Sequence, residues 1–108
     1  MDPLHLTTTR DNGTLTVRVS GELDIASTET LRGRLLDLLR EAGAGRGRGT
    51  VVLEVSGLSF IDAAGLGILV WVQTQADRES MSLRFAGVPP RMARLLEITG
   101  LNGYFATS

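Results

Sequence analysis

Residues 51–67 read VVLEVSGLSFIDAAGLG, the pattern of a strand followed directly by a helix. Residues 51–55 form a nearly continuous apolar run, which is typical of a strand covered on both faces. From Ala63 onward, apolar side chains recur at helical spacing, so we expect a helix to begin there. Asp62 stands between strand and helix and is expected to be the N-cap, whose carboxylate accepts free backbone N–H groups of the first turn.

A hairpin and a helix are expected on the N-terminal side of this stretch. Residues 5–20 contain two β-rich segments, separated by the turn signal Asp-Asn-Gly at residues 11–13. We expect these segments to pair as antiparallel strands. Apolar residues then recur at helical spacing over residues 31–42, and either Asp24 or Ser27 can cap the start of that helix.

The C-terminal side continues the alternation of strands and helices. Residues 82–86 have the pattern of a strand, Pro89 and Pro90 favour the start of a third helix, and Gly100 favours its end. The predicted order is β-β-α-β-α-β-α, which is an α/β fold with a mixed sheet and packed helices. We expect one domain over residues 1–108.

The composition excludes several classes of function. The chain has 108 residues, no cysteine and a formal net charge of −1, so thiolate metal sites and a bulk field for nucleic acid or anionic membranes are excluded. No apolar run approaches the roughly 20 residues of a membrane span. The first residues also lack the pattern of a signal peptide, so we expect a cytoplasmic protein that binds neither nucleic acid nor membranes directly.

Residues suited to catalysis are scarce. His5 is the single histidine, and neither a zinc motif nor a nucleophile elbow is present, so we expect no enzyme activity, no metal and no cofactor. Glycines alternate through residues 43–49, which favours a solvated connection over a phosphate-binding loop. A small-molecule or nucleotide sensor using this loop is a further hypothesis, which calorimetry with common nucleotides can test. Trp71 is expected to be a packing residue rather than an interface anchor.

Three motifs together resemble one known family. The stretch at residues 51–67 is similar to the central signature of STAS domains, in which a buried strand ends in an Asp-Ser-Ser/Thr-Gly-Leu loop opening a helix. Ser20–Asp24 resembles the family's Gly-x-Leu-Asp turn, and residues 87–101 resemble its last strand, helix and tail. The chain is thereby identified as a member of the anti-sigma factor antagonist type of STAS domain.

The resemblance implies a regulatory role through protein binding. Family members bind an anti-sigma factor, commonly of the serine-kinase type, and so free a sigma factor for RNA polymerase. The implied partner-binding residues lie in two segments: Glu22, Leu23, Asp24, Asp62, Ala63, Ala64, Gly65 and Leu66. The two segments become neighbours if their strands pair in parallel. For Gly65 and Gly67, packing of the helix against the sheet and direct contact with a partner are equally open.

One departure from the family pattern bears on regulation. In the family, the anti-sigma kinase phosphorylates a serine or threonine at the head of the second helix, but Ala64 stands at the matching position here and Ala63 precedes it. Alanine has no hydroxyl group, so a phosphorylation switch at this site is not expected; Ser59 and Ser56 are the nearby hydroxyl residues. Three accounts remain open: a natural antagonist that is not switched at this site, an engineered alanine version of a switchable protein, and a diverged STAS domain that binds something else. The alternative function is a diverged STAS interaction subunit of a larger sensory or transport complex. Oligomeric state has no signature in the sequence.

Overall fold

The computed structural model describes residues 3–11, 13–43, 49–79, 81–101, 103 and 106–107. The expected element order is confirmed, and a short strand follows it near the C-terminus. The elements are β1 (His5–Asp11), β2 (Thr14–Leu23), α1 (Thr28–Gly43), β3 (Thr50–Ile61), α2 (Ala63–Arg78), β4 (Ser82–Ala86), α3 (Pro90–Thr99) and β5 (Ala106–Thr107). Most of the predicted connection at residues 43–49 lies outside the described residues, as does Asn12 of the first turn.

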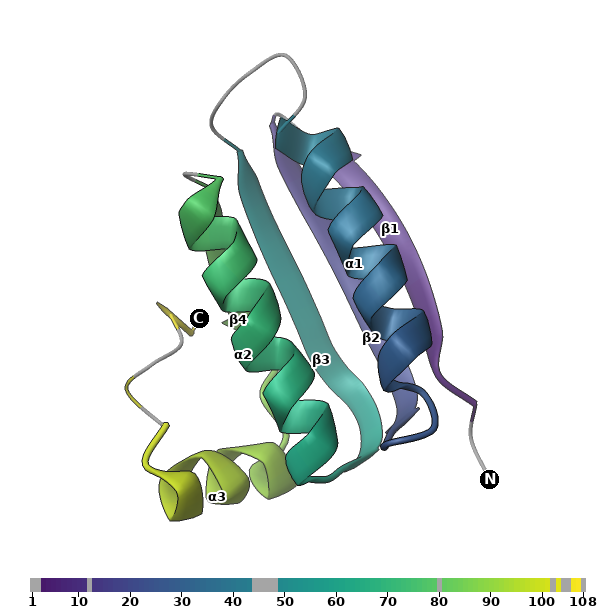
Figure 1. The fold of residues 1–108 in the computed structure, drawn as a ribbon, viewed down its shortest axis with the longest axis vertical. Helices are drawn as coiled ribbons and strands as arrows, with labels where there is room; N and C mark the ends of the chain where they lie inside the picture. The colour runs from purple at the N-terminus through teal and green to yellow at the C-terminus, as the bar shows by residue number, and fades with distance from the viewer. Residues whose placement is uncertain are drawn as a thin grey trace.

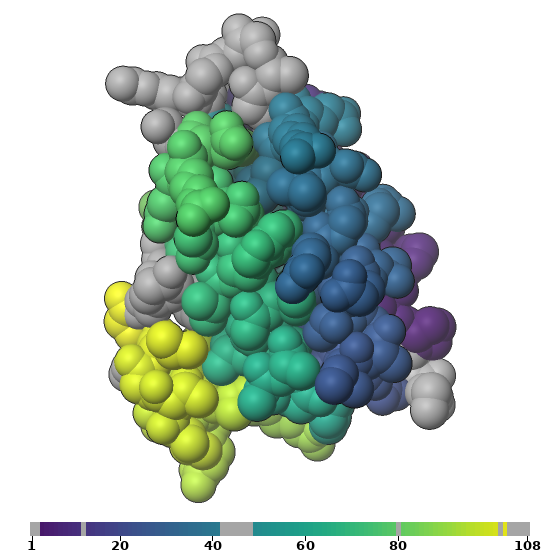
Figure 2. Space-filling model, viewed as in Figure 1, coloured from purple at the N-terminus to yellow at the C-terminus, as the bar shows by residue number. Residues whose placement is uncertain are grey.

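The strands form a mixed sheet in the order β1-β2-β3-β4-β5. β1 and β2 pair in antiparallel fashion, as the hairpin pattern predicts, and the remaining neighbours pair in parallel. Because each parallel connection advances the sheet by one strand in the same direction, right-handed crossovers bring α1 and α2 to the same face. The two helices lie side by side on that face (Figures 1 and 2), and α3 lies across the end of the molecule where α2 begins.

The hydrophobic core lies between this layer of helices and the sheet. Alternate residues of the central strands point into it, and Val17, Leu53 and Phe85 are fully buried there. The predicted apolar stripe of α1 faces them, since Leu31 and Leu35 are also buried. Burial of each such side chain contributes about 1.5–3 kcal/mol, so the core fixes the positions of the strand ends and helix starts.

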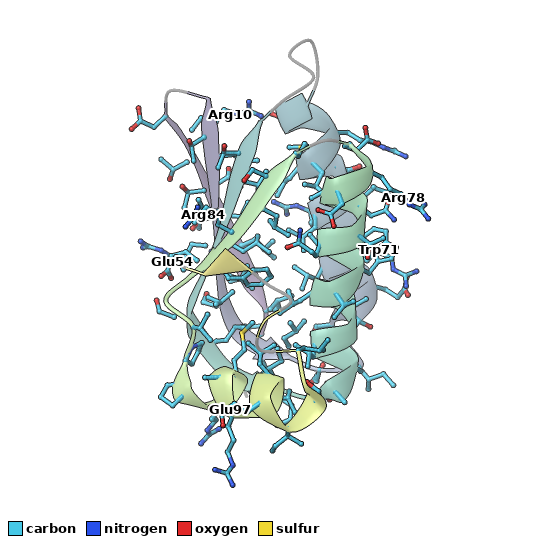
Figure 3. The ribbon with its side chains drawn as sticks, turned by 90° about the vertical axis from the view of Figure 1, so that its left-hand side faces the viewer. Arg10, Glu54, Trp71, Arg78, Arg84 and Glu97 are labelled. Atoms are coloured by element: carbon cyan, nitrogen blue, oxygen red, sulfur yellow. The ribbon has the colours of Figure 1, made fainter. Side chains whose placement is uncertain are left out.

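The opposite face of the sheet is open, and the prediction that β3 is covered on both faces is therefore wrong. Val52 of β3 is only partly buried. Its neighbours across the sheet are Thr16 of β2 and Arg84 of β4, and Arg84 is exposed. Figure 3 shows Glu54 and Arg84 projecting from the face opposite α2. The physical reason is that successive crossovers of one hand all return over the same side of the sheet.

The helix boundaries agree with the local sequence signals. Asp62 is the N-cap of α2, and Pro90 is the first residue of α3. Gly100 ends α3 in the left-handed conformation (φ 76°), with its N–H donating to the carbonyl groups of Glu97 and Leu96. Within the described ranges, no helix is both long and apolar enough to cross a bilayer.

Candidate functional site

The parallel pairing of β2 and β3 brings the two predicted segments together. Leu23 at the end of β2 is in register with Ile61 at the end of β3. The backbone N–H of Asp62 also donates to the carbonyl oxygen of Leu23 at 3.4 Å. The prediction that the two loops are neighbours is therefore confirmed. They form the carboxyl edge of the sheet, where α1 and α2 both begin (Figure 1) and where open α/β sheets commonly bind their ligands.

The β2–α1 turn, residues 24–27, is held by a compact set of hydrogen bonds. The Asp24 carboxylate accepts the backbone N–H groups of Ala26 and Ser27 at 3.0 and 3.1 Å. The Ser27 hydroxyl accepts the backbone N–H of Asp24 at 3.0 Å and lies 3.2 Å from the carbonyl oxygen of Glu22, to which it can donate. Both candidate capping residues thus take part, and they fix the backbone from the strand end to the helix start.

The β3–α2 turn is tighter, because Asp62 is the single residue between strand and helix. Its side-chain Oδ1 accepts the backbone N–H of Gly65 at 2.9 Å, which confirms the predicted N-cap. Its carbonyl oxygen accepts the N–H of Leu66, also at 2.9 Å. Ala63 is exposed and Ala64 is partly exposed at the head of the helix. The position that matches the family's phosphoacceptor is thus accessible but lacks a hydroxyl group.

The two glycines of α2 have different surroundings. A Cβ atom on Gly65 would lie 2.7 Å from both the Cγ and the carbonyl oxygen of Leu23. Gly65 is therefore required for the close approach of α2 to the end of β2, as the packing interpretation expects. A Cβ atom on Gly67 would have nothing within 4 Å, and Gly67 is exposed, so that interpretation is wrong for Gly67.

The predicted site residues divide into a buried and an accessible group. Leu23, Gly65 and Leu66 are buried, so they shape the edge from beneath rather than offer side-chain surface. The accessible or partly accessible members are Glu22, Asp24, Asp62, Ala63 and Ala64. Any partner that docks here would therefore touch the acidic turn residues and the head of α2.

Two exposed apolar residues at this edge were missed by the sequence reasoning. Ile25, in the β2–α1 turn, is 77% exposed, and Phe60, near the end of β3, is 41% exposed. Phe60 is exposed because β3 contains a bulge: Leu58 pairs with Gly21 but Phe60 pairs with the next residue, Glu22. Ser59 is the extra residue, and it shifts Phe60 off the buried face that regular alternation from Leu58 would give it.

The charge at the edge is predominantly acidic. Glu22, Asp24, Glu29 and Asp62 belong to the two turns or the helix starts, and residues 19–31 and 49–77 contain no arginine. One basic side chain also reaches this edge: Arg91 of α3 donates a hydrogen bond to the carbonyl oxygen of Ser59 at 3.2 Å. The edge thus combines carboxylates with exposed apolar side chains, which suits binding of a protein surface.

Trp71, Glu54 and His5 lie outside the two turns. Trp71 is partly buried against the core, and the Arg32 guanidinium lies 5.3 Å from its ring centroid, so the packing interpretation holds. Glu54 accepts hydrogen bonds from the Ser56 N–H and hydroxyl at 3.1 and 2.6 Å on the open face. His5 is an exposed residue of the edge strand β1.

Comparison with known proteins identifies the class. The family profile described as "Mlab, STAS domain" matches residues 6–107, and the chain therefore belongs to the STAS domain family. Its relatives include anti-sigma factor antagonists. The chain is 30% identical over 98 residues to the anti-sigma-B factor antagonist of Staphylococcus aureus (strain NCTC 8325 / PS 47), covering 91% of this chain and 86% of that protein. The resemblance drawn from the three sequence motifs is confirmed.

Solved structures share the fold. An anti-sigma factor antagonist from Mycobacterium paratuberculosis matches with a TM-score of 0.81 at 22% identity, covering 98% of this chain and 86% of that one. The unphosphorylated form of the anti-sigma factor antagonist SpoIIAA matches with a TM-score of 0.73 at 18% identity, covering 96% and 88%. The predicted fold class is therefore confirmed.

Proposed function

We propose that this protein is an anti-sigma factor antagonist that binds an anti-sigma factor of the serine-kinase type and thereby frees a sigma factor for RNA polymerase. The observation that carries the proposal is the meeting of the two family motifs at one edge, where Leu23 and Ile61 are in register. The names of the relatives support the general role. This role requires binding and no catalysis. It also requires that the protein be in the cytoplasm, because sigma factors act there on RNA polymerase.

The proposed contact surface consists of the β2–α1 turn and the head of α2. Its accessible carboxylates are those of Glu22, Asp24 and Asp62, and its accessible small residues are Ala63 and Ala64. Small side chains at the head of α2 would let a partner approach the helix backbone closely. The buried residues Leu23, Gly65 and Leu66 would keep the two segments in register.

We further propose that the protein is not switched by phosphorylation at Ala64. A phosphate group there would add a charge of about −1.5 to −2 beside the carboxylate of Asp62, which is the physical basis for releasing a partner from a desolvated contact. Alanine cannot accept the phosphoryl group, so the surface would remain in its binding state. Regulation would then act on the partner or on the amount of this protein.

The proposal is tested by measuring complex formation with purified anti-sigma factors encoded in the same genome. Wild-type protein should form a stable complex with at least one of them. Glu22→Lys and Asp62→Lys should each weaken it, because a cation would replace a carboxylate in the contact. Asp62→Lys also removes a helix cap, so Asp62→Asn, which keeps the cap, is the control that isolates the charge. Normal binding by the two lysine variants would contradict the proposed surface.

The alternative is a diverged STAS interaction subunit of a larger sensory or transport complex. It uses the same fold but requires no anti-sigma factor. Failure to bind any anti-sigma factor of the host, together with co-purification of other subunits, would favour it.

A further inference from the structure

Ile25 is the most exposed large apolar side chain among the described residues. It is 77% exposed, compared with 71% for Ile98 on α3 and 41% for Phe60. Single exposed apolar residues are common on protein surfaces and carry no meaning alone. Ile25 differs in its position, because it directly follows Asp24 in the turn that meets the head of α2.

The backbone that carries Ile25 is fixed on both sides. Before it, the Asp24 carboxylate accepts the N–H groups of Ala26 and Ser27 at 3.0 and 3.1 Å. After it, the Thr28 hydroxyl donates to the carbonyl oxygen of Ile25 itself at 3.0 Å, and Thr28 is buried. A side chain presented on such a turn loses little conformational freedom when it binds, which favours its use as an anchor.

The chain segment around Ile25 is rich in carboxylates, and one of them, Glu29, lies 3.8 Å from the guanidinium of Arg32. Glu22 and Asp24 precede it and Glu29 follows it, and no arginine occurs between Arg18 and Arg32. The whole chain is nearly neutral, with 11 basic and 12 acidic residues, so the acidic character belongs to this segment. Charge complementarity therefore calls for a partner surface that carries arginine or lysine side chains around an apolar centre.

We propose that Ile25 is the apolar anchor of the complex: it inserts into an apolar pocket of the anti-sigma factor, and basic residues at the rim of that pocket face the acidic turn that contains Glu22 and Asp24. The inference rests on the function proposed above and adds the chemistry of the partner's surface. An apolar contact surrounded by a polar rim is the usual arrangement of a binding hot spot.

The test compares Ile25→Ala with Ile98→Ala in affinity for the host anti-sigma factors, measured by calorimetry. The two isoleucines have nearly equal exposure, but Ile98 lies on α3. We expect Ile25→Ala to weaken binding by about 30-fold or more, and Ile98→Ala to leave it unchanged. Ile25→Val should lose less affinity than Ile25→Ala, and circular dichroism should show that all three variants remain folded.

The outcomes separate this inference from the proposed function. Wild-type binding that Ile25→Ala leaves intact would overturn the anchor and leave the antagonist role standing. Absence of wild-type binding to every anti-sigma factor would overturn both. An association rate that falls with added salt supports the basic rim, whereas a rate independent of salt would overturn that part.

Discussion

The β2–α1 turn and the β3–α2 turn lie beside each other at one edge of the sheet, and each contains an aspartate whose carboxylate accepts backbone N–H groups. In the second turn, Asp62 leads directly into α2, and Gly65 brings that helix against Leu23. In the first turn, residues 24–27 separate strand from helix and leave Ile25 exposed.

The difference shows how one type of cap can serve two purposes. The tight turn fixes the position of a helix relative to a neighbouring strand and exposes mainly the small side chains of Ala63 and Ala64. The wider turn has room to present an apolar side chain on a fixed backbone. We therefore expect substitutions in the tight turn to affect stability first, and substitution of Ile25 to affect binding with little effect on stability.

The largest loss of stability should follow Gly65→Ala. The added Cβ would lie 2.7 Å from the backbone carbonyl oxygen of Leu23, so α2 or β2 must shift. Overpacking costs about 1–3 kcal/mol, and a clash with a backbone oxygen lies at the upper end of that range, because the backbone cannot rotate aside as a flexible side chain can. After the gain of about 1 kcal/mol from replacing a helical glycine by alanine, the net loss should be about 2 kcal/mol or more. Urea denaturation measures the free energy of unfolding. An unchanged or raised value would show that the close approach to Leu23 is not needed.

A smaller loss is expected for Asp24→Ala. The substitution removes the acceptor of two backbone hydrogen bonds in the first turn and should reduce the free energy of unfolding by about 1–2 kcal/mol. Asp24→Asn keeps an oxygen acceptor at the same position and should lose less. An equal loss of unfolding free energy in the two variants would mean that the charge of Asp24, and not its hydrogen bonds, stabilises the turn.

Asp62→Ala should reduce stability by about 1 kcal/mol, because the N-cap bond to the Gly65 N–H is lost. Asp62→Asn should be nearly neutral, since asparagine is an equally good N-cap. Thermal unfolding of both variants checks this. A destabilised Asp62→Asn variant would show that the charge of the carboxylate contributes more to stability than its hydrogen bond to the Gly65 N–H.

The smallest effect, and one of opposite sign, is expected for Gly67→Ala. Nothing lies within 4 Å of the new Cβ, so the variant should be more stable by up to about 1 kcal/mol from helix propensity alone. It is the matched control for Gly65→Ala in the same helix. A loss of stability would contradict the open surroundings of Gly67.

The sequence predicts those features that have a local signal. Asp62 follows an apolar run and precedes helical spacing, so its capping role could be predicted, and the parallel crossovers imply that the two turns meet. The bulge at Ser59 could not be predicted, because an inserted residue leaves no periodic mark and is defined only by the pairing with β2. The exposure of Ile25 likewise depends on the path of the turn. The run at residues 51–55 suggested burial on both faces, yet Val52 faces the open side of the sheet.

The most direct test of the account is the affinity of the wild-type protein for a host anti-sigma factor with and without Mg-ATP. The missing hydroxyl at Ala64 predicts tight binding that ATP leaves unchanged. Ala64→Ser, which restores a hydroxyl at an accessible position of α2, should make binding sensitive to ATP if the partner is a kinase. Loss of wild-type binding on addition of ATP would contradict the account, because another residue or the partner itself would then provide the switch.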